Sequence, residues 1–258
     1  MMKLGVCATA ENAALIKQKG FDYIEIPVCS YAQVPESDFK RQLSSLRNAD
    51  FTCLGANFFF PSIMKVVGPD VDSKKIEDYC KKAVDRSFEM GVKVLTIGSG
   101  KSRFCPDGFS RTSAVDQFGS WLSYVGDLID SSDCIIGIEP IRHQSTNILN
   151  TIHECIDLAK AVNHKKVKVM TDFQQLMCQG DSFEDLASSN GMIVHAHISN
   201  SRTLACPSSS EEDEYEGFFK ALLTCKYHGM VSVETLKYGD SLDPTYLREM
   251  IGFYFKEN

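Results

Sequence analysis

The chain has 258 residues, of which 43% are hydrophobic and 24% charged, and its formal net charge is -7. These proportions are typical of a globular protein and exclude a disordered chain. No apolar run is long enough to span a membrane, so we predict no membrane partner. The negative charge disfavours nucleic-acid binding, because phosphates would be repelled. The length favours one domain over residues 1–258, since α/β barrels commonly occupy about 250 residues.

Short apolar runs alternate with amphipathic stretches along the sequence. Strands are predicted at residues 3–8, 23–27, 52–57, 94–98, 134–140, 167–172, 193–199 and 230–235. Helices are predicted between and after them, at 11–18, 36–47, 74–90, 113–129, 148–162, 183–188, 215–226 and 244–255. The strands are nearly continuously apolar, which is typical of parallel strands that are buried on both faces.

Strict alternation of eight strands with eight helices predicts an α/β fold, a single (β/α)8 TIM barrel. A doubly wound open sheet is the alternative. That fold needs a glycine-rich phosphate loop after the first strand, where this chain has Ala8, Thr9 and Ala10. The sequence Gly98-Ser99 with a second glycine, after the fourth strand, is interpreted as a tight barrel loop.

The ten cysteines are spread along the chain and include no C-x-x-C pair. Most of them lie in apolar runs, where a thiol behaves as a small hydrophobic side chain. A disulfide framework normally belongs to a much shorter secreted chain. We therefore expect free, buried thiols and a cytoplasmic protein.

The last four strands each end near a group that can bind a metal, at the barrel face where active sites lie. These groups are Glu139, Asp172, His197 and Glu234. Each alone would also suit a capped loop, a salt bridge or a core histidine, but three converging carboxylates would repel one another without a cation. The set suits one divalent ion: Mn²⁺, Mg²⁺, Co²⁺ or Zn²⁺. His195 shares a strand face with His197, which is preferred as ligand because it lies nearer the strand end.

Several short segments, in this order and spacing, carry a family resemblance. They are GFDYIE at 20–25, NFFFP at 57–61, IEP at 138–140, TD at 171–172, HAH at 195–197 and VET at 233–235. Through them the chain resembles the xylose-isomerase-like barrels. These include sugar-phosphate isomerases and epimerases, ketose 3-epimerases, inosose dehydratases and endonuclease IV.

The resemblance implies one divalent ion held by the four groups named above, with Glu139 and Glu234 as acid and base on opposite substrate faces. In such enzymes the metal binds adjacent oxygens of a sugar and stabilises the enediolate formed when a proton leaves the neighbouring carbon. Return of the proton to the other face gives epimerisation, and return to the adjacent carbon gives isomerisation. Loss of a β-hydroxyl instead gives dehydration.

Further residues are predicted to contact a small carbohydrate substrate. Arg202 resembles an arginine that follows the seventh strand in the epimerase branch, although an exposed loop arginine is the alternative. Glu25 ends the second strand and would contact the substrate or close a salt bridge. Lys101 and Arg103 follow the fourth strand and could meet a phosphate or carboxylate. His143 follows the fifth strand closely enough to approach the mouth.

Two positions depart from the family pattern. Gln175 stands where many members have a histidine after the sixth strand, and Ser145 stands where the epimerase branch often has a glutamate. Glutamine can hydrogen-bond to a substrate but cannot shuttle a proton near neutral pH. Both departures favour either a substrate other than a free ketose or a loss of activity, and they leave the predicted metal site unchanged.

The favoured function is a divalent-metal-dependent isomerase or epimerase of a small sugar, keto-sugar or polyol derivative. An inosose-type dehydratase on the same site and a sugar-binding barrel without catalysis are the alternatives. A repair endonuclease is disfavoured, because the third and fourth strands end at Asn57 and Gly98 without the extra histidines of that branch. For the assembly, a homodimer and a homotetramer are both left open.

Overall fold

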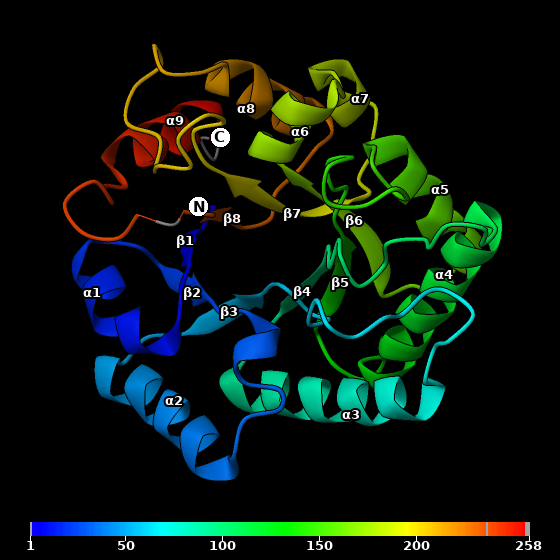
Figure 1. Ribbon diagram of the computed structural model, residues 1–258. Helices are drawn as coiled ribbons and strands as arrows, with labels where there is room; N and C mark the ends of the chain where they lie inside the picture. Colours follow the sequence, from blue (N-terminus) through cyan, green and yellow to red (C-terminus); the bar gives the residue numbers. More distant parts are fainter. Residues whose placement is uncertain (1, 236, 256–258) are drawn as a thin grey trace.

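Residues 2–235 and 237–255 are described by a computed structural model. Eight parallel strands pair in chain order, and β1 pairs with β8 to close the barrel (Figure 1). The strands are β1 Leu4–Cys7, β2 Tyr23–Glu25, β3 Cys53–Ala56, β4 Val94–Ile97, β5 Ile135–Ile138, β6 Val167–Asp172, β7 Ile193–Ile198 and β8 Val231–Val233. The predicted (β/α)8 TIM barrel is confirmed.

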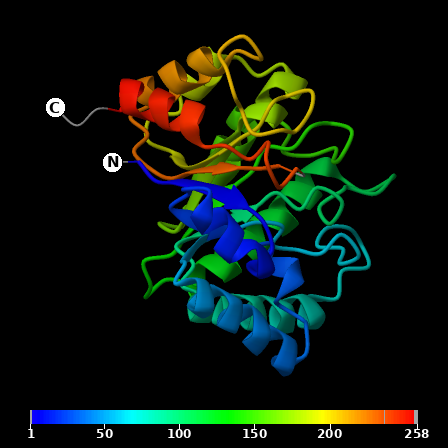
Figure 2. The same ribbon diagram turned by 90° about the vertical axis from the view of Figure 1, so that its left-hand side faces the viewer.

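Helices surround this barrel on the outside (Figures 1 and 2). They are α1 Ala13–Gln18, α2 Glu36–Ala49, α3 Ser73–Met90, α4 Arg111–Leu128, α5 Ile152–Val162, α6 Phe173–Gln179, α7 Phe183–Ala187, α8 Tyr215–Thr224 and α9 Thr245–Tyr254. Short 3₁₀ turns, Ala10–Asn12 and Val28–Ser30, follow β1 and β2. No helix in the described parts of the chain is long and apolar enough to cross a membrane.

Helix α5 begins four residues later than predicted. Leu149 has a φ of 57°, which a right-handed helix cannot include. Thr151 then caps the helix, and its side chain and that of Glu154 satisfy each other's backbone N–H groups in a capping box. The stretch before Thr151 is therefore free to form an irregular loop over the barrel mouth.

Helix α6 was not predicted, because it has only seven residues and follows β6 without a loop. Asp172 is both the last residue of β6 and the cap of α6: its Oδ1 accepts a hydrogen bond from the Gln175 N–H at 2.6 Å. The helix ends at Gly180, where φ is 83°. One oxygen, Oδ1, thus holds the Asp172 carboxylate at the strand end. The other oxygen, Oδ2, takes no part in the cap.

The barrel interior is polar near the mouth, although the layer between strands and helices is apolar. Glu25 projects into this interior from β2, and Gly55 on the neighbouring strand makes room for it. A Cβ atom at Gly55 would lie 2.7 Å from the Glu25 carboxylate. The ten cysteines are all free, as predicted, and all but Cys29 and Cys178 are buried.

Arg86 on α3 joins the loop after β2 to the rest of the structure. Its side chain is 5% exposed. It donates hydrogen bonds to the carbonyl oxygens of Tyr31 (2.5 Å) and Val34 (2.9 Å) and lies 4.5 Å from the Phe39 ring centroid. The contact with Tyr31 is buried and that with Val34 is partly buried, so the loss of this donor would leave at least one buried carbonyl without its partner.

We predict that Arg86→Met lowers the free energy of unfolding by about 2–4 kcal/mol, because buried carbonyls lose a charged donor. Urea denaturation followed by circular dichroism measures this change. Lys82→Met, on the exposed face of the same helix, removes the same charge and should shift the free energy by less than about 0.5 kcal/mol. Equal midpoints for the two variants would contradict the prediction.

Candidate metal centre and active site

Four side chains from consecutive strands meet at the barrel mouth. Glu139 follows β5, Asp172 ends β6, His197 lies in β7 and Glu234 follows β8. One potential ligand atom of each lies within 4.8 Å of the others. In the strand pairing, Asp172 is directly beside His197. The structure therefore brings together all four residues that the sequence singled out.

His197 presents one ring nitrogen to this group and uses the other as an anchor. Its Nε2 lies 2.9 Å from Glu25 Oε1, while its Nδ1 faces Asp172 Oδ2 at 3.8 Å and Glu234 Oε2 at 3.7 Å. Neither that Nδ1 nor Asp172 Oδ2 has a hydrogen-bond partner within the described chain. Unpartnered nitrogen and carboxylate oxygens that converge in a buried site fit a divalent cation.

The electrostatics of the group point the same way. Burial, and after it the charge of Glu234, raises the pKa of Asp172 to about 7, and the same two causes raise the pKa of Glu139 well above its usual range. Burial lowers the pKa of His197, but the charge of Glu25 and smaller contributions from Cys7 and Glu234 together outweigh burial, and the pKa is raised well above its usual value. Without a cation the group therefore retains protons, which a divalent ion would displace.

Glu25 has a different place from the one predicted. It is fully buried beneath the group, and its oxygens bond to His195 Nε2 (2.7 Å), His197 Nε2 and Ser232 Oγ (2.6 Å). Burial raises its pKa, but the charges of the two histidines outweigh that effect and the pKa is well below its usual range. Glu25 is not part of the cavity wall, and its contacts with the two histidines match the salt-bridge alternative rather than the expected substrate contact.

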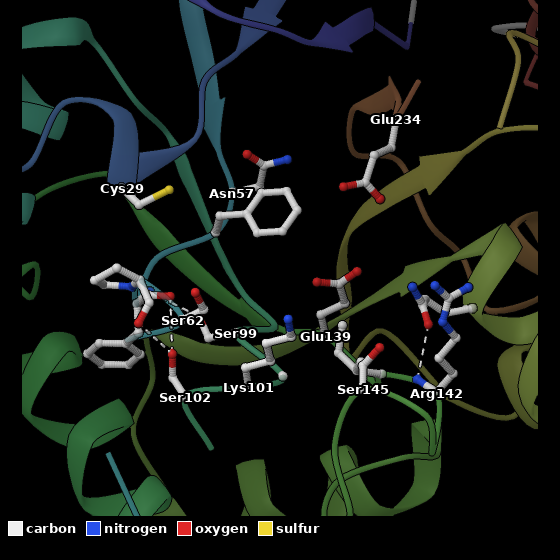
Figure 3. A pocket seen from close by; sticks show the side chains of 16 residues that line it. Cys29, Asn57, Ser62, Ser99, Lys101, Ser102, Glu139, Arg142, Ser145 and Glu234 are labelled. Carbon is white, nitrogen blue, oxygen red and sulfur yellow. Dashed lines mark hydrogen bonds between the residues drawn. The ribbon is translucent and has the colours of Figure 1, made fainter. Parts of the chain in front are cut away.

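A cavity of about 440 Å³ opens beside Glu139 and Glu234. Figure 3 shows these two carboxylates extending toward each other from opposite sides of the space. A second hollow of about 320 Å³ adjoins it and shares Asn57, Gln175 and Glu234 in its walls. Spaces of this size suit a small molecule. The mouth therefore has room for a substrate next to the four converging side chains.

Lys101 and Gln175 are the predicted substrate contacts that line this cavity, and the other four, Arg202, His143, Glu25 and Arg103, do not. Arg202 is exposed and donates to the backbone oxygen of Glu212 in its own loop. His143 is exposed and is outside the cavity wall, so the structure places neither Arg202 nor His143 at the cavity, and their contact with a substrate stays a prediction. Both lie in long loops whose course the local sequence does not determine.

Arg103 is also not available to a phosphate or carboxylate of a substrate. It is fully buried, and its Nη2 donates to the carbonyl oxygens of Glu139 and Leu149, both at 2.9 Å. Its guanidinium lies 5.3 Å from the Phe118 ring centroid. Arg103 thus holds the backbone at Glu139. Its burial was not predicted, because a basic residue in a loop is normally exposed.

Sequence reasoning passed over Asn57 and Arg142, which both line the cavity. Asn57 is 2% exposed, and neither atom of its amide has a hydrogen-bond partner in the described part of the protein. Its position directly after β3 was a usable signal, since active sites gather at strand ends. Arg142 had no such signal, because it belongs to the irregular loop after β5.

Gly98, directly after β4, is required by the position of Glu139. A Cβ atom there would overlap the Glu139 carboxylate. The next residue, Ser99, has a φ of 49°, and its Oγ accepts from the Phe60 N–H at 2.9 Å. The glycine-containing segment is therefore a tight barrel loop, as predicted, and it makes room for the Glu139 carboxylate.

The profile of the xylose isomerase-like TIM barrel family matches residues 13–256. The chain belongs to this family. It is thus a member of an enzyme family, as the sequence predicted. A comparison with curated proteins finds no significant match.

Solved structures with the same fold include several sugar epimerases. The D-psicose 3-epimerase of Clostridium cellulolyticum H10, with D-tagatose, is 16% identical with a TM-score of 0.78, covering 96% of this chain and 89% of that one. The 3-keto-D-glucoside 4-epimerase of E. coli is 15% identical with a TM-score of 0.74, covering 100% of both chains. A family 2 AP endonuclease from Brucella melitensis is 17% identical with a TM-score of 0.74, covering 99% and 98%. At these identities the likeness establishes the shared fold.

The raised pKa of Asp172 predicts how the metal-free protein responds to pH. Its folded pKa of about 7 exceeds the ordinary value of 3.8, so the folded state binds more protons and stability falls as pH rises between those values. Asp172→Asn keeps a capping oxygen and removes this effect. With a chelator present, the free energy of unfolding of the variant minus that of the parent should increase by about 2 kcal/mol from pH 5 to pH 8.

Thermal or urea denaturation at several pH values measures this difference. Asp116→Asn, on the exposed face of α4, is the control for loss of a negative charge. A difference between Asp172→Asn and the parent that stays constant with pH would contradict the prediction.

The contact between Glu25 and His197 predicts an effect on metal binding from a residue outside the ligand set. Glu25→Gln keeps the size of the side chain but loses the charge that orients the imidazole. We expect the affinity for Mn²⁺ to fall by about 10–100-fold. Calorimetric titration measures it, with the melting temperature as a check on folding; an unchanged affinity in a folded variant would refute the role.

Proposed function

We propose that this chain is a divalent-metal-dependent isomerase or epimerase of a small sugar, keto-sugar or polyol derivative. The observation that carries the proposal is the convergence of Glu139, Asp172, His197 and Glu234 beside a cavity of substrate size. These four residues would hold one ion of Mn²⁺, Mg²⁺, Co²⁺ or Zn²⁺. Oxygen ligands with one imidazole suit each of these ions.

The two glutamates would exchange the proton. When bound, the divalent ion supplies Lewis-acid polarisation of a carbonyl and of the oxygen beside it. Glu139 and Glu234 face the substrate space from opposite sides (Figure 3). One carboxylate removes the proton from the carbon next to the carbonyl, and the other returns a proton from the opposite face, which inverts that carbon. The buried Asn57 amide and Gln175 offer hydrogen bonds that orient the sugar hydroxyls.

A nuclease function is less well supported. The positions that would need extra histidines are Asn57 and Gly98, and at Gly98 any side chain would collide with the Glu139 carboxylate. The net charge of -7 also opposes a phosphate backbone. A dehydratase would use the same site. It would differ from an isomerase or epimerase in its product, because the substrate would lose a β-hydroxyl as water.

The first test is calorimetric titration of metal-stripped protein with Mn²⁺. We expect one tight site, lost in Asp172→Ala and in His197→Ala, because each variant removes one of four converging ligands. Asp116→Ala and His143→Ala, which alter exposed residues of the same types, should bind as the parent does. No binding to the parent, repeated with Co²⁺, Mg²⁺ and Zn²⁺, would refute the proposal.

The second test is deuterium uptake from D₂O into keto-sugars, followed by NMR. The metal-loaded protein should exchange the proton next to the carbonyl, and Glu139→Gln and Glu234→Gln should each slow exchange by at least about 100-fold. Loss of water from the substrate would identify a dehydratase. Sugar binding without exchange would indicate a barrel that has lost catalysis.

A further inference from the structure

Five residues border both hollows at the barrel mouth, and two of them carry side-chain amides. The five are Asn57, Phe58, Arg142, Gln175 and Glu234. Since Glu234 is one of the two glutamates that face the substrate space, a sugar that reacts there lies against this shared boundary. The two amides are thus placed beside the reacting part of the substrate.

The orientation of the Gln175 amide is fixed by the loop after β5. Its Oε1 accepts a hydrogen bond from the backbone N–H of Arg142 at 3.0 Å, drawn in Figure 3 as the dashed line at Arg142. A backbone N–H can only donate, so the oxygen of the amide, and not its nitrogen, must face the loop. The Nε2 group lies on the other side of the planar amide and has no partner within the described residues. Gln175 therefore offers a hydrogen-bond donor to the two hollows that it lines.

Two more hydrogen bonds hold this donor in place. The backbone N–H of Gln175 is bonded to Asp172 Oδ1 at 2.6 Å, so the residue is tied directly to one of the four converging side chains. One turn later in α6, Gln179 Oε1 accepts from the backbone N–H of His143 at 3.3 Å. Two successive N–H groups of the loop are thus bonded to two glutamines of one helix. The donor of Gln175 is therefore positioned before a substrate enters.

Asn57 differs from Gln175 in its hydrogen-bonding capacity. Its side chain is 2% exposed, and neither its oxygen nor its nitrogen has a partner within residues 2–235 and 237–255. A buried amide in this state is costly until a polar ligand satisfies it. A sugar hydroxyl can do so, since it both donates and accepts. The boundary thus has a hydroxyl site at Asn57 and a site at Gln175 that can only donate, which suits an oxygen without a hydrogen.

Such an oxygen is the one that becomes negative in the proposed reaction. When the carbon next to the carbonyl loses its proton, the C–H bond breaks, its electron pair forms a C=C bond, and the carbonyl π electrons move onto the oxygen. The proton passes to Glu139 or Glu234, and the amide keeps both of its own protons. A hydrogen bond from the amide to that oxygen strengthens as the charge develops, which is the condition for a contact to raise the rate.

Arg142 is the other donor at this boundary. Its guanidinium forms no hydrogen bond or ion pair with the part of the chain that the structure describes, so nothing fixes its position. Gln175 is fixed through both its backbone and its side chain. Because a positioned donor stabilises a developing charge without first reorganising, the geometry favours Gln175.

We propose that Gln175 is a catalytic residue whose Nε2–H group binds the carbonyl oxygen of the substrate and stabilises the negative charge that follows proton removal. This inference rests on the proposed function, and it adds a catalytic group that is neither one of the two glutamates nor a predicted metal ligand. Asn57 binds a hydroxyl of the same sugar.

Deuterium exchange tests this role on the Mn²⁺-loaded protein with D-fructose, D-psicose and D-tagatose, of which the one that the parent exchanges fastest is used for the variants. Gln175→Met should lower kcat by about 100-fold and change KM by less than about threefold, because the lost bond is stronger in the transition state. Gln175→Glu, at about pH 8 where a carboxyl is ionised, keeps an oxygen for the Arg142 N–H but has no amide donor, and should lose about as much.

Gln179→Met is the matched control. It removes the neighbouring contact between α6 and the loop, and Gln179 lies outside both cavity walls. This variant should exchange deuterium at the rate of the parent. Melting temperatures show whether each variant is folded.

Calorimetric titration with glycolohydroxamate is a readout that needs no turnover. This small hydroxamate resembles the planar, negatively charged species that proton removal creates. It should bind to Mn²⁺-loaded Gln175→Met at least about tenfold more weakly than to the parent, and to Gln179→Met as tightly as to the parent.

Exchange at the rate of the parent in Gln175→Met would overturn the inference and leave the proposed function intact. An equal loss in Gln179→Met, or full activity in Gln175→Glu, would assign the effect to the loop contact and overturn the inference as well. No exchange of any of the three sugars by the parent would count against the proposed function. The hydroxamate would then still decide whether Gln175 donates into the cavity, since equal affinity for the parent and Gln175→Met would exclude it.

Discussion

The contact between Glu25 and His197 is the interaction on which the site depends. An imidazole can turn and can carry its proton on either nitrogen. The fully buried Glu25 removes both freedoms, since it accepts from Nε2 at 2.9 Å and leaves Nδ1 directed at Asp172 and Glu234. Glu25 is itself held by His195 and Ser232. The orientation of the His197 imidazole is therefore determined by a polar network inside the barrel.

This arrangement has a cost that the surrounding barrel must support. Burial and the charge of Glu234 raise the pKa values of Glu139 and Asp172, so these buried carboxylates oppose folding when they are ionised and no cation is bound. Two features allow the carboxylates to be buried. Gly55 and Gly98 leave space for the side chains of Glu25 and Glu139. Arg103 holds the backbone at Glu139 through a hydrogen bond. Under the proposed function, a bound divalent ion would stabilise the folded protein relative to its metal-free state.

Several features of the site could be predicted because they follow from the spacing of apolar residues and from the order of strands and helices along the chain. An apolar run that ends in a carboxylate or histidine places that group at the mouth once the run is a barrel strand, and this rule found Glu139, Asp172, His197 and Glu234. The same rule, applied to β3, would have found Asn57. The start of α5 and the existence of α6 were missed, because they depend on the caps at Thr151 and Asp172.

The sequence by itself determined the alternation of strands and helices. It thereby also determined which end of the barrel carries Glu139, Asp172, His197 and Glu234. Parallel strands all point the same way, so their final residues must share one end. Only the tertiary structure decided that Glu25 lies beneath the site, that Arg103 is buried, and that Arg142 reaches the cavity while Arg202 does not. Those positions depend on how loops from different strands pack on one another, which no local pattern encodes.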